Sequence, residues 1–238
     1  MTQSNAQRAA RAFAQFLLMT ALLTLAGCAT TQVITANSKP PIQLQTMILD
    51  AERVDIMILP FAPNLEKLPS SGSDDIPVSA EVRRAESRYL AFHLKDTLER
   101  TGNWGIVRVV PSAARHHPLL VSGKILASDG ERLAVSVTAT DASGRVWLTQ
   151  TYEDNASKYA YQSIKEDPFQ DLYNNIANDL VAQYQTRSAN EINAVKQIAQ
   201  LSFAADLAPD AFARYLTKNR DGTTSLTQVP ADSDTILQ

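Results

Sequence analysis

The sequence predicts an α+β fold, in which helices cover one face of a mixed β-sheet. Short runs rich in β-branched residues, separated by turn residues, are typical of strands. A long helical pattern lies between the first and second of these runs, and further helical patterns follow the last one. This succession of elements favours a two-layer sandwich with the hydrophobic core between sheet and helices.

The predicted strands follow the order strand, helix, and then four strands. The first strand occupies 54–61, an apolar run next to Pro60 and Pro63. The other four are expected at 105–110, 119–128, 133–140 and 145–153.

The helix expected over 77–100 has apolar residues at helical spacing. Gly102 follows the pattern, where a glycine commonly ends a helix. We expect this apolar stripe to face the sheet. Its members are Val82, Ala85, Tyr89 and Phe92, widened by Leu90, Leu94 and Leu98.

Two turns set the predicted strand registers. A loop at 141–144 would pair Ala139 with Val146 and Val137 with Leu148, so that apolar residues meet. A three-residue loop at 129–131 would pair Ile125 with Val135 and Ala127 with Leu133. These registers and the helical stripe predict the following buried residues: Ile58, Tyr89, Phe92, Val121, Val135, Val137 and Leu148.

The carboxy-terminal part is expected to be helical. Asp167 and Pro168 open one helix, and Ser188 with Glu191 forms a capping box before a helix at 189–205. A short last helix is expected at 209–216. The predicted organisation is a leader at 1–27, a flexible tether at 28–45, the sandwich at 46–187, a helical extension at 188–217 and a disordered tail at 218–238.

The first residues have the layout of a secretory leader. Arg8 and Arg11 precede an apolar run at 16–26, and small residues follow it. The run is shorter than the about 20 apolar residues that a membrane-spanning helix needs. Cys28, the only cysteine, follows directly. An ordinary signal peptide beside an incidental cysteine is the alternative interpretation.

The tetrapeptide Leu25-Ala26-Gly27-Cys28 resembles the lipobox of bacterial lipoproteins. The resemblance implies that the Cys28 thiol receives a diacylglyceryl group and that cleavage leaves Cys28 as an acylated first residue. Ala29 follows, whereas Asp at that position marks inner-membrane retention in enteric-type lipoproteins. The resemblance therefore implies a lipid anchor in the outer membrane, on its periplasmic face.

The net charge limits the classes of partner. Removal of the leader changes the formal charge from −3 to −5, and the chain has no block of Lys or Arg. Binding to nucleic acid is therefore not expected. Electrostatic attachment to anionic lipid is not expected either, so the acyl chains on Cys28 would hold the membrane.

Several short segments resemble a known architecture when taken in order. They are Leu59-Pro60-Phe61, Gly102-Asn103-Trp104, the strand 119–125 and the turn 141–146. Their succession over about 54–184 resembles the periplasmic α/β sandwich of the TolB amino-terminal domain. It is also similar to the curli-secretion lipoprotein and to lipoproteins that activate peptidoglycan synthases. The resemblance implies this fold and a role in holding or regulating envelope machinery, with no catalytic residue.

No metal, cofactor or catalytic site is expected. His116 and His117 are adjacent, so in an extended segment their side chains point in opposite directions, and His93 has no acidic neighbour at ligand spacing. Glycine-rich phosphate loops and the Gly-x-Ser-x-Gly motif are both missing from the sequence. Three acids near one another are interpreted as solvated rather than catalytic: Asp154, Glu166 and Asp167.

The sheet face opposite the core is the candidate partner-binding surface. The predicted register places Thr138 beside Trp147 and Ser136 beside Thr149. A tryptophan among short hydroxyl side chains suits a protein interface. The alternative is that the carboxy-terminal helices cover Trp147, and the sequence does not decide between the two.

These observations favour a non-catalytic binding, assembly or regulatory module for a cell-envelope complex. A structural oligomeric subunit of a secretion complex is the second hypothesis, and an enzyme acting on cell wall or polysaccharide is the third. The expected partners are the membrane, through Cys28, and a periplasmic or outer-membrane protein. Further copies of the chain are a third candidate.

Overall fold

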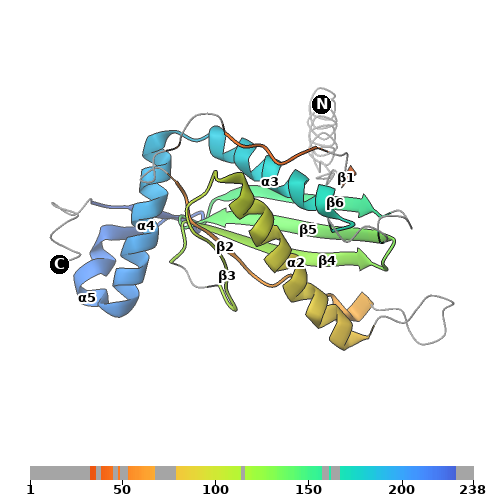
Figure 1. Cartoon of the computed structure of the whole chain (residues 1–238). Helices are drawn as coiled ribbons and strands as arrows, with labels where there is room; N and C mark the ends of the chain where they lie inside the picture. The colour runs from red at the N-terminus through yellow and green to blue at the C-terminus, as the bar shows by residue number, and fades with distance from the viewer. Residues whose placement is uncertain are drawn as a thin grey trace, which may run out of the picture. The chain divides into compact units, whose positions relative to one another are not determined.

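A computed structural model describes residues 33–35, 39–44, 48, 53–67, 79–113, 116–156, 161 and 167–228. Its centre is a six-stranded mixed sheet with helices on one face, so the predicted α+β class is confirmed (Figure 1). Cys28 and Glu166, and most of the predicted tether, lie outside the described residues. In the part of the chain that is described, no helix is long and apolar enough to cross a bilayer.

The sheet is built on an antiparallel meander of three long strands. These are β4 (Leu119–Ser128), β5 (Arg132–Asp141) and β6 (Val146–Asn155). Strand β2 (Ile56–Ile58) lies parallel to both β4 and β3 (Val107–Val109). All five predicted strands are present. The sixth, β1 (Val33–Thr35), pairs in parallel with β6 at the other edge and was not predicted.

Helices α2 (Ala80–Thr101) and α3 (Gln170–Gln185) lie across the same face of the sheet (Figure 1). The Ser79 side chain accepts a hydrogen bond from the Val82 backbone N–H at the start of α2. Gly102 ends this helix in the left-handed conformation, at φ 67°. The core between the helices and the sheet includes the predicted residues Ile58, Val121, Val135 and Val137, all fully buried, with Leu148 partly buried against it.

The predicted orientation of α2 is only partly right. Leu90, Leu94 and Leu98 face the sheet as predicted, whereas Tyr89 and Phe92 are 53% and 54% exposed. The buried side of α2 also carries polar residues that have found partners. The Ser87 hydroxyl donates to the Phe61 carbonyl, and Arg83 Nη2 donates to the Ser128 carbonyl at 2.9 Å. The hydrogen bond of Ser87 replaces one with water, and Arg83 also forms an ion pair with Glu86 at 3.1 Å, although Arg83 Nε is buried without a hydrogen-bond partner.

The β4–β5 and β5–β6 registers match the prediction only in part. Ile125 pairs with Val135 as predicted, but an irregularity at Leu126 moves Ala127 opposite Ala134. A second irregularity between Ala139 and Thr140 places Ala139 opposite Leu148 rather than Val146. The extra residue of this bulge is Trp147. A bulge places two residues of one strand opposite one residue of the other and changes where a side chain points.

The amino-terminal segment is more ordered than a flexible tether. Besides β1, the backbone N–H of Ile42 donates to Asn178 Oδ1 at 2.7 Å. The backbone N–H of Leu44 donates to Asn103 Oδ1 at 2.9 Å, and the Leu44 side chain packs against the core. Within the stretch predicted to be a tether, 33–35 therefore pair with β6, and side-chain amides of α3 and of the loop after α2 bind the backbone of Ile42 and Leu44.

The carboxy-terminal extension begins at the predicted capping box, where Ser188 and Glu191 bond reciprocally. It contains α4 (Ala189–Leu207), α5 (Pro209–Phe212) and the short helix η3 (Ala213–Tyr215). A hairpin of β7 (Leu216–Lys218) and β8 (Thr224–Leu226) follows. Residues 218–228 thus form structure where a disordered tail was predicted, and Thr224 N–H donates to the Ser143 carbonyl at 2.7 Å. Another short helix, η1 (Leu65–Lys67), follows β2.

Candidate binding surfaces

Trp147 is a buried residue, only 4% exposed, and is part of the core. Its indole N–H donates to Asp141 Oδ2 at 2.8 Å, and the Arg187 guanidinium carbon lies 4.6 Å from its ring centroid. Of the two alternatives that the sequence left open, burial is therefore the one observed. The prediction that Trp147 is exposed at a partner surface is therefore wrong. The bulge in β6 places its ring beneath the connection between α3 and α4.

Asp141 holds this end of the sheet together. Its Oδ1 accepts hydrogen bonds from the Ser143 backbone N–H and hydroxyl, at 2.9 and 2.6 Å, and from the Arg145 N–H at 3.1 Å. Its Oδ2 accepts from Trp147. Both oxygens of this buried carboxylate are occupied by structural bonds, so we assign Asp141 to the turn rather than to chemistry.

Thr138 and Thr149 do lie opposite each other on the face away from the helices. Their hydroxyl oxygens are 3.4 Å apart, and Ser136 pairs with Thr151 beside them. With Trp147 buried, this face presents short hydroxyl side chains without the aromatic anchor that was expected. A protein hot spot is usually built around such an anchor, so this face is a weak candidate.

Two of the three histidines have structural partners. His116 Nε2 lies 3.1 Å from Asp206 Oδ2, and its ring packs edge-on against Phe203. His93 Nε2 lies 2.9 Å from Gln170 Oε1. Among the described residues, no group of three or more His, Cys, Asp or Glu side chains could hold a metal ion.

A cleft of about 740 Å³ separates the β5–β6 turn from the carboxy-terminal extension. His117, Asp206 and Lys218 are the ionisable residues that line it together with Asp141. Burial, with a smaller contribution from His116, lowers the pKa of His117 below its usual value. Because the Asp141 carboxylate is already saturated by hydrogen bonds, the cleft offers no pair of free carboxylates for acid–base chemistry.

The acids that the sequence placed near one another also have structural roles. Asp167 Oδ2 accepts the Tyr89 hydroxyl at 2.6 Å, and Asp167 Oδ1 accepts the Phe169 N–H at 2.8 Å. Burial, reinforced by the charges of Asp171 and Asp167, raises the pKa of Asp154. A raised pKa in a half-buried carboxyl is explained here by its surroundings and does not require catalysis.

The solvent face of α2 carries the apolar surface that the sequence analysis had assigned to the core. Val82, Tyr89 and Phe92 are each more than half exposed, and Ala85 is exposed between them. We call these four residues the α2 stripe. They recur at three- and four-residue spacing, so they share one side of the helix.

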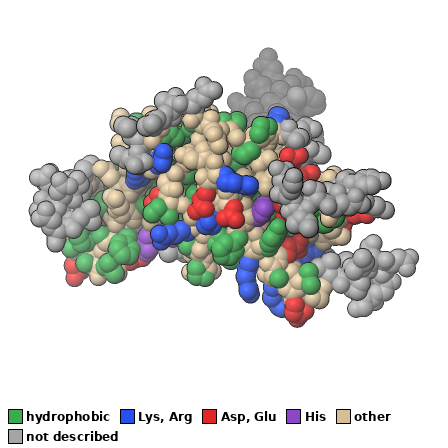
Figure 2. Space-filling model, in the orientation of Figure 1, with side chains coloured by type: hydrophobic (Ala, Val, Ile, Leu, Met, Phe, Trp, Pro, Cys, Tyr) green, Lys and Arg blue, Asp and Glu red, His purple; other side chains and the backbone are tan. Residues whose placement is uncertain are grey.

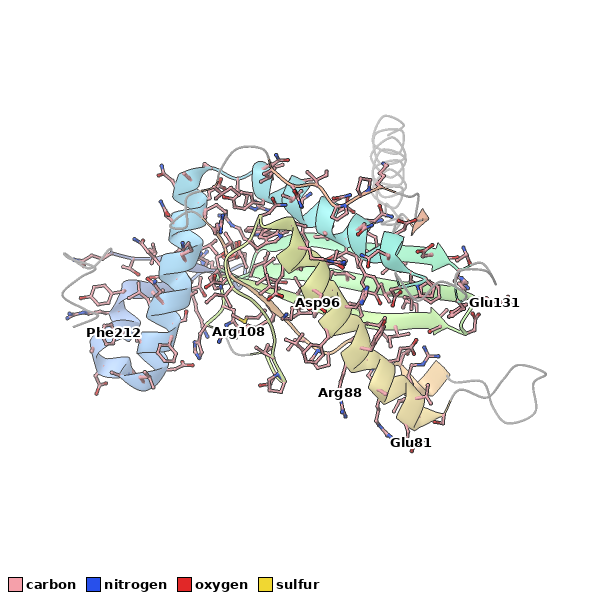
Figure 3. All side chains as sticks on the ribbon, in the orientation of Figure 1. Glu81, Arg88, Asp96, Arg108, Glu131 and Phe212 are labelled. Atoms are coloured by element: carbon pink, nitrogen blue, oxygen red, sulfur yellow. The ribbon has the colours of Figure 1, made fainter. Side chains whose placement is uncertain are left out.

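Charged residues lie around and beyond the α2 stripe. Figure 2 shows hydrophobic side chains among basic and acidic ones over this helix. Glu81, Arg88 and Asp96 follow one another along α2 in Figure 3, and all three are exposed. The hydroxyl of Tyr89 is fixed by Asp167, so the ring is presented in one position. A fixed aromatic on a well-packed helix loses little conformational freedom when a partner binds.

No protein-family model matches the chain, and no curated protein matches it in sequence. Among solved structures, a DUF330-family protein from Xanthomonas campestris is similar at 10% identity and a TM-score of 0.39, covering 65% of this chain and 97% of its own. A PelC dodecamer from Paraburkholderia phytofirmans is 15% identical, with a TM-score of 0.35, and the match covers 60% of this chain and 94% of the PelC chain. A hypothetical protein from Chlamydia trachomatis is 11% identical, with a TM-score of 0.29 and coverage of 64% and 99%. Similarity at this level carries no functional conclusion, so function is argued below from the residues of the chain itself.

Proposed function

We propose that this protein is a lipid-anchored lipoprotein of the outer membrane that faces the periplasm. It acts there as a non-catalytic binding and assembly module for a cell-envelope complex. The α2 stripe is the docking surface in this proposal. Acyl chains on Cys28, at the end of the apolar leader, are its membrane anchor.

The observation that carries the proposal is the exposure of the α2 stripe. Monomeric proteins often expose single apolar residues, but a contiguous apolar patch rimmed by charges is typical of an interaction site. Tyr89 and Phe92, each more than half exposed, are aromatic residues of the kind enriched at protein interfaces. The helix that carries them is held by the core, so the stripe is presented on a rigid element.

The arrangement of ionisable groups among the described residues also supports a binding role. In the described part of the chain, the buried Asp141 carboxylate accepts hydrogen bonds from its own turn and from Trp147, and the His116 ring is paired with Asp206. The cleft beside them brings together single ionisable groups rather than a nucleophile with its base. The open sheet face carries short hydroxyl groups around Thr138 and Thr149, with Lys124 opposite Ser136.

The position of β1 sets how far the body can lie from such an anchor. Val33 follows Cys28 by five residues, and that length of extended chain spans at most about 18 Å. The edge of the sheet formed by β1 would then stay within this distance of the acylated cysteine. The anchored protein would work close to the membrane surface rather than at the end of a long tether.

The membrane part of the proposal is tested by metabolic labelling with radioactive palmitate in the native bacterium. Wild-type protein should incorporate label and sediment with outer-membrane markers. Cys28→Ser should incorporate none and accumulate as uncleaved precursor or soluble product. An unlabelled wild-type protein, or one that sediments with inner-membrane markers, would contradict the anchor or its location.

The docking part is tested by placing a photo-crosslinking residue at Phe92 in the full-length chain in cells. The matched control carries the same residue at Glu131, an exposed position on the β4–β5 turn. Crosslinks from position 92 to a defined protein, absent from position 131, would support docking through the α2 stripe. Equal crosslinking from both positions, or none from either, would exclude the stripe as the docking surface.

A further inference from the structure

A short extended segment between β1 and β2 lies across the end of α2 and the middle of α3. We call residues 39–44 the strap, and Figure 1 shows it running beside α3. Four of its six residues are exposed, and only Pro41 and Leu44 are partly buried. The Leu44 side chain packs against the core. Few apolar contacts therefore hold the strap on the body.

Two asparagine side chains bind the backbone of the strap at alternate residues. Asn178 Oδ1 accepts the Ile42 N–H at 2.7 Å, and Asn178 Nδ2 donates to the Pro40 carbonyl at 3.3 Å. Asn103 Oδ1 accepts the Leu44 N–H at 2.9 Å, and Asn103 Nδ2 donates to the Ile42 carbonyl at 2.7 Å. We call these two side chains the amide clamp. Each amide binds one carbonyl and the N–H two residues later, as a neighbouring parallel strand does.

The body of the fold fixes the amide clamp in place. Gly102 ends α2 in the left-handed conformation, and Asn103 follows it directly and is only 4% exposed. Asn178 belongs to α3 and is partly exposed. A buried amide without hydrogen bonds is costly, so the clamp favours having an extended backbone bound to it. The groups that the clamp binds are main-chain groups, which other peptides also carry.

We propose that the amide clamp is a binding site for an extended peptide of a partner protein, and that the strap fills this site until such a peptide displaces it. The site goes beyond the proposed function, because it lies outside the α2 stripe. Main-chain hydrogen bonds give affinity for an extended peptide, and a pocket for one side chain gives specificity. The peptide that fits has an apolar residue at the position of Leu44. Prolines near its start, as at Pro40 and Pro41, favour the extended form before binding.

The exposure of the strap favours its displacement. A segment with few buried apolar side chains and exposed hydrogen bonds opens at a lower cost in free energy than the core does. The bond from Gln43 Nε2 to the Arg100 carbonyl, at 3.3 Å, is also exposed. Because the strap belongs to the same chain, it competes at a high effective concentration. A free peptide should therefore bind only weakly to the wild-type protein.

The test uses the full-length acylated protein in detergent and a fluorescein-labelled peptide with the sequence of residues 39–44. Fluorescence anisotropy measures the affinity. Ile42→Pro/Leu44→Ser weakens the strap, since it removes the N–H that Asn178 accepts and the apolar contact with the core. This variant should bind the peptide at least about tenfold more tightly than wild type does. A peptide carrying the same two changes should not bind.

Asn178→Ala, added to the weakened strap, should reduce peptide binding by about tenfold, because it removes two of the four clamp bonds. Gln185→Ala, at an exposed position of α3, is the matched control and should not change binding. Thermal melting checks that each variant is folded. Where the double strap variant does not melt cooperatively, Ile42→Pro alone replaces it, since it keeps the Leu44 side chain.

Three results would overturn the proposal. The first is a folded strap variant that binds the peptide no more tightly than wild type, and the second is binding that Asn178→Ala leaves unchanged. The third is a wild-type dimer, measured by light scattering, that Asn178→Ala dissociates, because the occupant would then be the strap of a second copy. Crosslinking from Phe92 tests a different surface, so either proposal can fail while the other survives.

Discussion

In the body of the protein, the sheet and helices α2 and α3 enclose a continuous core, with residues such as Val137 and Ile176 fully buried. The carboxy-terminal extension, 188–228, buries far less. Its apolar contribution comes from one side of α4, through residues such as Ile192 and Ile198, whereas α5 buries none of its residues. The extension is joined to the body by polar contacts as well, among them the His116–Asp206 pair and the bond from Thr224 to Ser143.

This difference in buried apolar surface indicates that the extension depends on the body for its stability more than the body depends on the extension. Local unfolding starts where few apolar side chains are buried, so the extension should open before the body does. The body does not need the extension for its own core, except where Ile192 joins it and where Trp147 lies beneath the α3–α4 connection. Substitutions in the two regions should therefore differ in how much they lower the free energy of unfolding and in how much of the chain they unfold.

The largest expected effect is loss of the whole fold by Val137→Asp. Val137 is fully buried in β5, and an unpaired charge there costs several kcal/mol, against a typical total stability of about 5–15 kcal/mol. Circular dichroism should show loss of the cooperative melt in both regions. A melting temperature equal to that of wild type would show that Val137 does not face the core.

Trp147→Ala should destabilise the protein by about 3–5 kcal/mol, because it leaves a cavity where both regions meet. Trp147→Phe is the matched variant, since it keeps an aromatic ring but removes the hydrogen bond to Asp141. It should cost about 1–3 kcal/mol. Urea unfolding of both variants measures the difference. A wild-type midpoint for Trp147→Ala would contradict the burial of this ring.

Acidification should loosen the extension before the body. The pKa of His117 is lowered in the folded state, so the opened form takes up a proton first as the pH falls below about 6.5. Stability is therefore present above that pH and is lost below it, by at most about 1.4 kcal/mol per pH unit. The ionisable groups near His117 are His116, Asp206, Lys218 and Asp141.

Hydrogen exchange of α4 amides between pH 7.5 and 5.5 measures this loosening. His117→Asn, which cannot take up the proton, should flatten the dependence. Amides of β5 should serve as the internal reference, because they belong to the body. An equal loss of protection from exchange in β5 and α4 would contradict the expectation that the extension opens before the body.

The smallest effect is expected for Arg132→Gln at the edge of the body. Arg132 Nε and Nη2 donate to the two carboxylate oxygens of Glu153 at 2.7 and 2.8 Å, but the pair is solvent-exposed. Exposed ion pairs contribute about 0–1 kcal/mol. The hydrogen bonds from Arg132 lower the pKa of Glu153, so this small contribution is present at neutral pH and lost in acid. Added salt should reduce it further, which a melt at two ionic strengths would show.

The positions of β2 to β6 could be predicted from the sequence because period and composition decide them locally, whereas β1 and the β7–β8 hairpin are too short to show a period. The capping box at Ser188 and Glu191 is of the same kind: its two side chains bond within four residues of chain. The register after Ala139 could not be predicted, because the bulge at Trp147 depends on Asp141 and Arg187, which are brought together only by folding.

The face of α2 that meets the sheet was predicted only in part, for a related reason. The helix has two apolar sides, one with Leu90 and Leu94 and one with Tyr89 and Phe92. Periodicity alone favours neither. The buried side includes Ser87, whose partner is the distant carbonyl of Phe61, and the sequence does not show that this polar residue is satisfied. The second apolar side of α2, with Tyr89 and Phe92, was the feature of the sequence that could have indicated the candidate site.

The short strand β2 has a consequence for the order in which the chain folds. Ile56 pairs with Val107 and Leu119, far along the chain, whereas Ile125 pairs with Val135 across a tight turn. Nearby pairs form faster than distant ones, so the β4–β5–β6 meander should form early and β2 should join late. If the chain is exported amino-terminus first, as the proposed function requires, β2 would emerge before its partner strands. The β3 edge of the sheet could then close only after β4 had emerged.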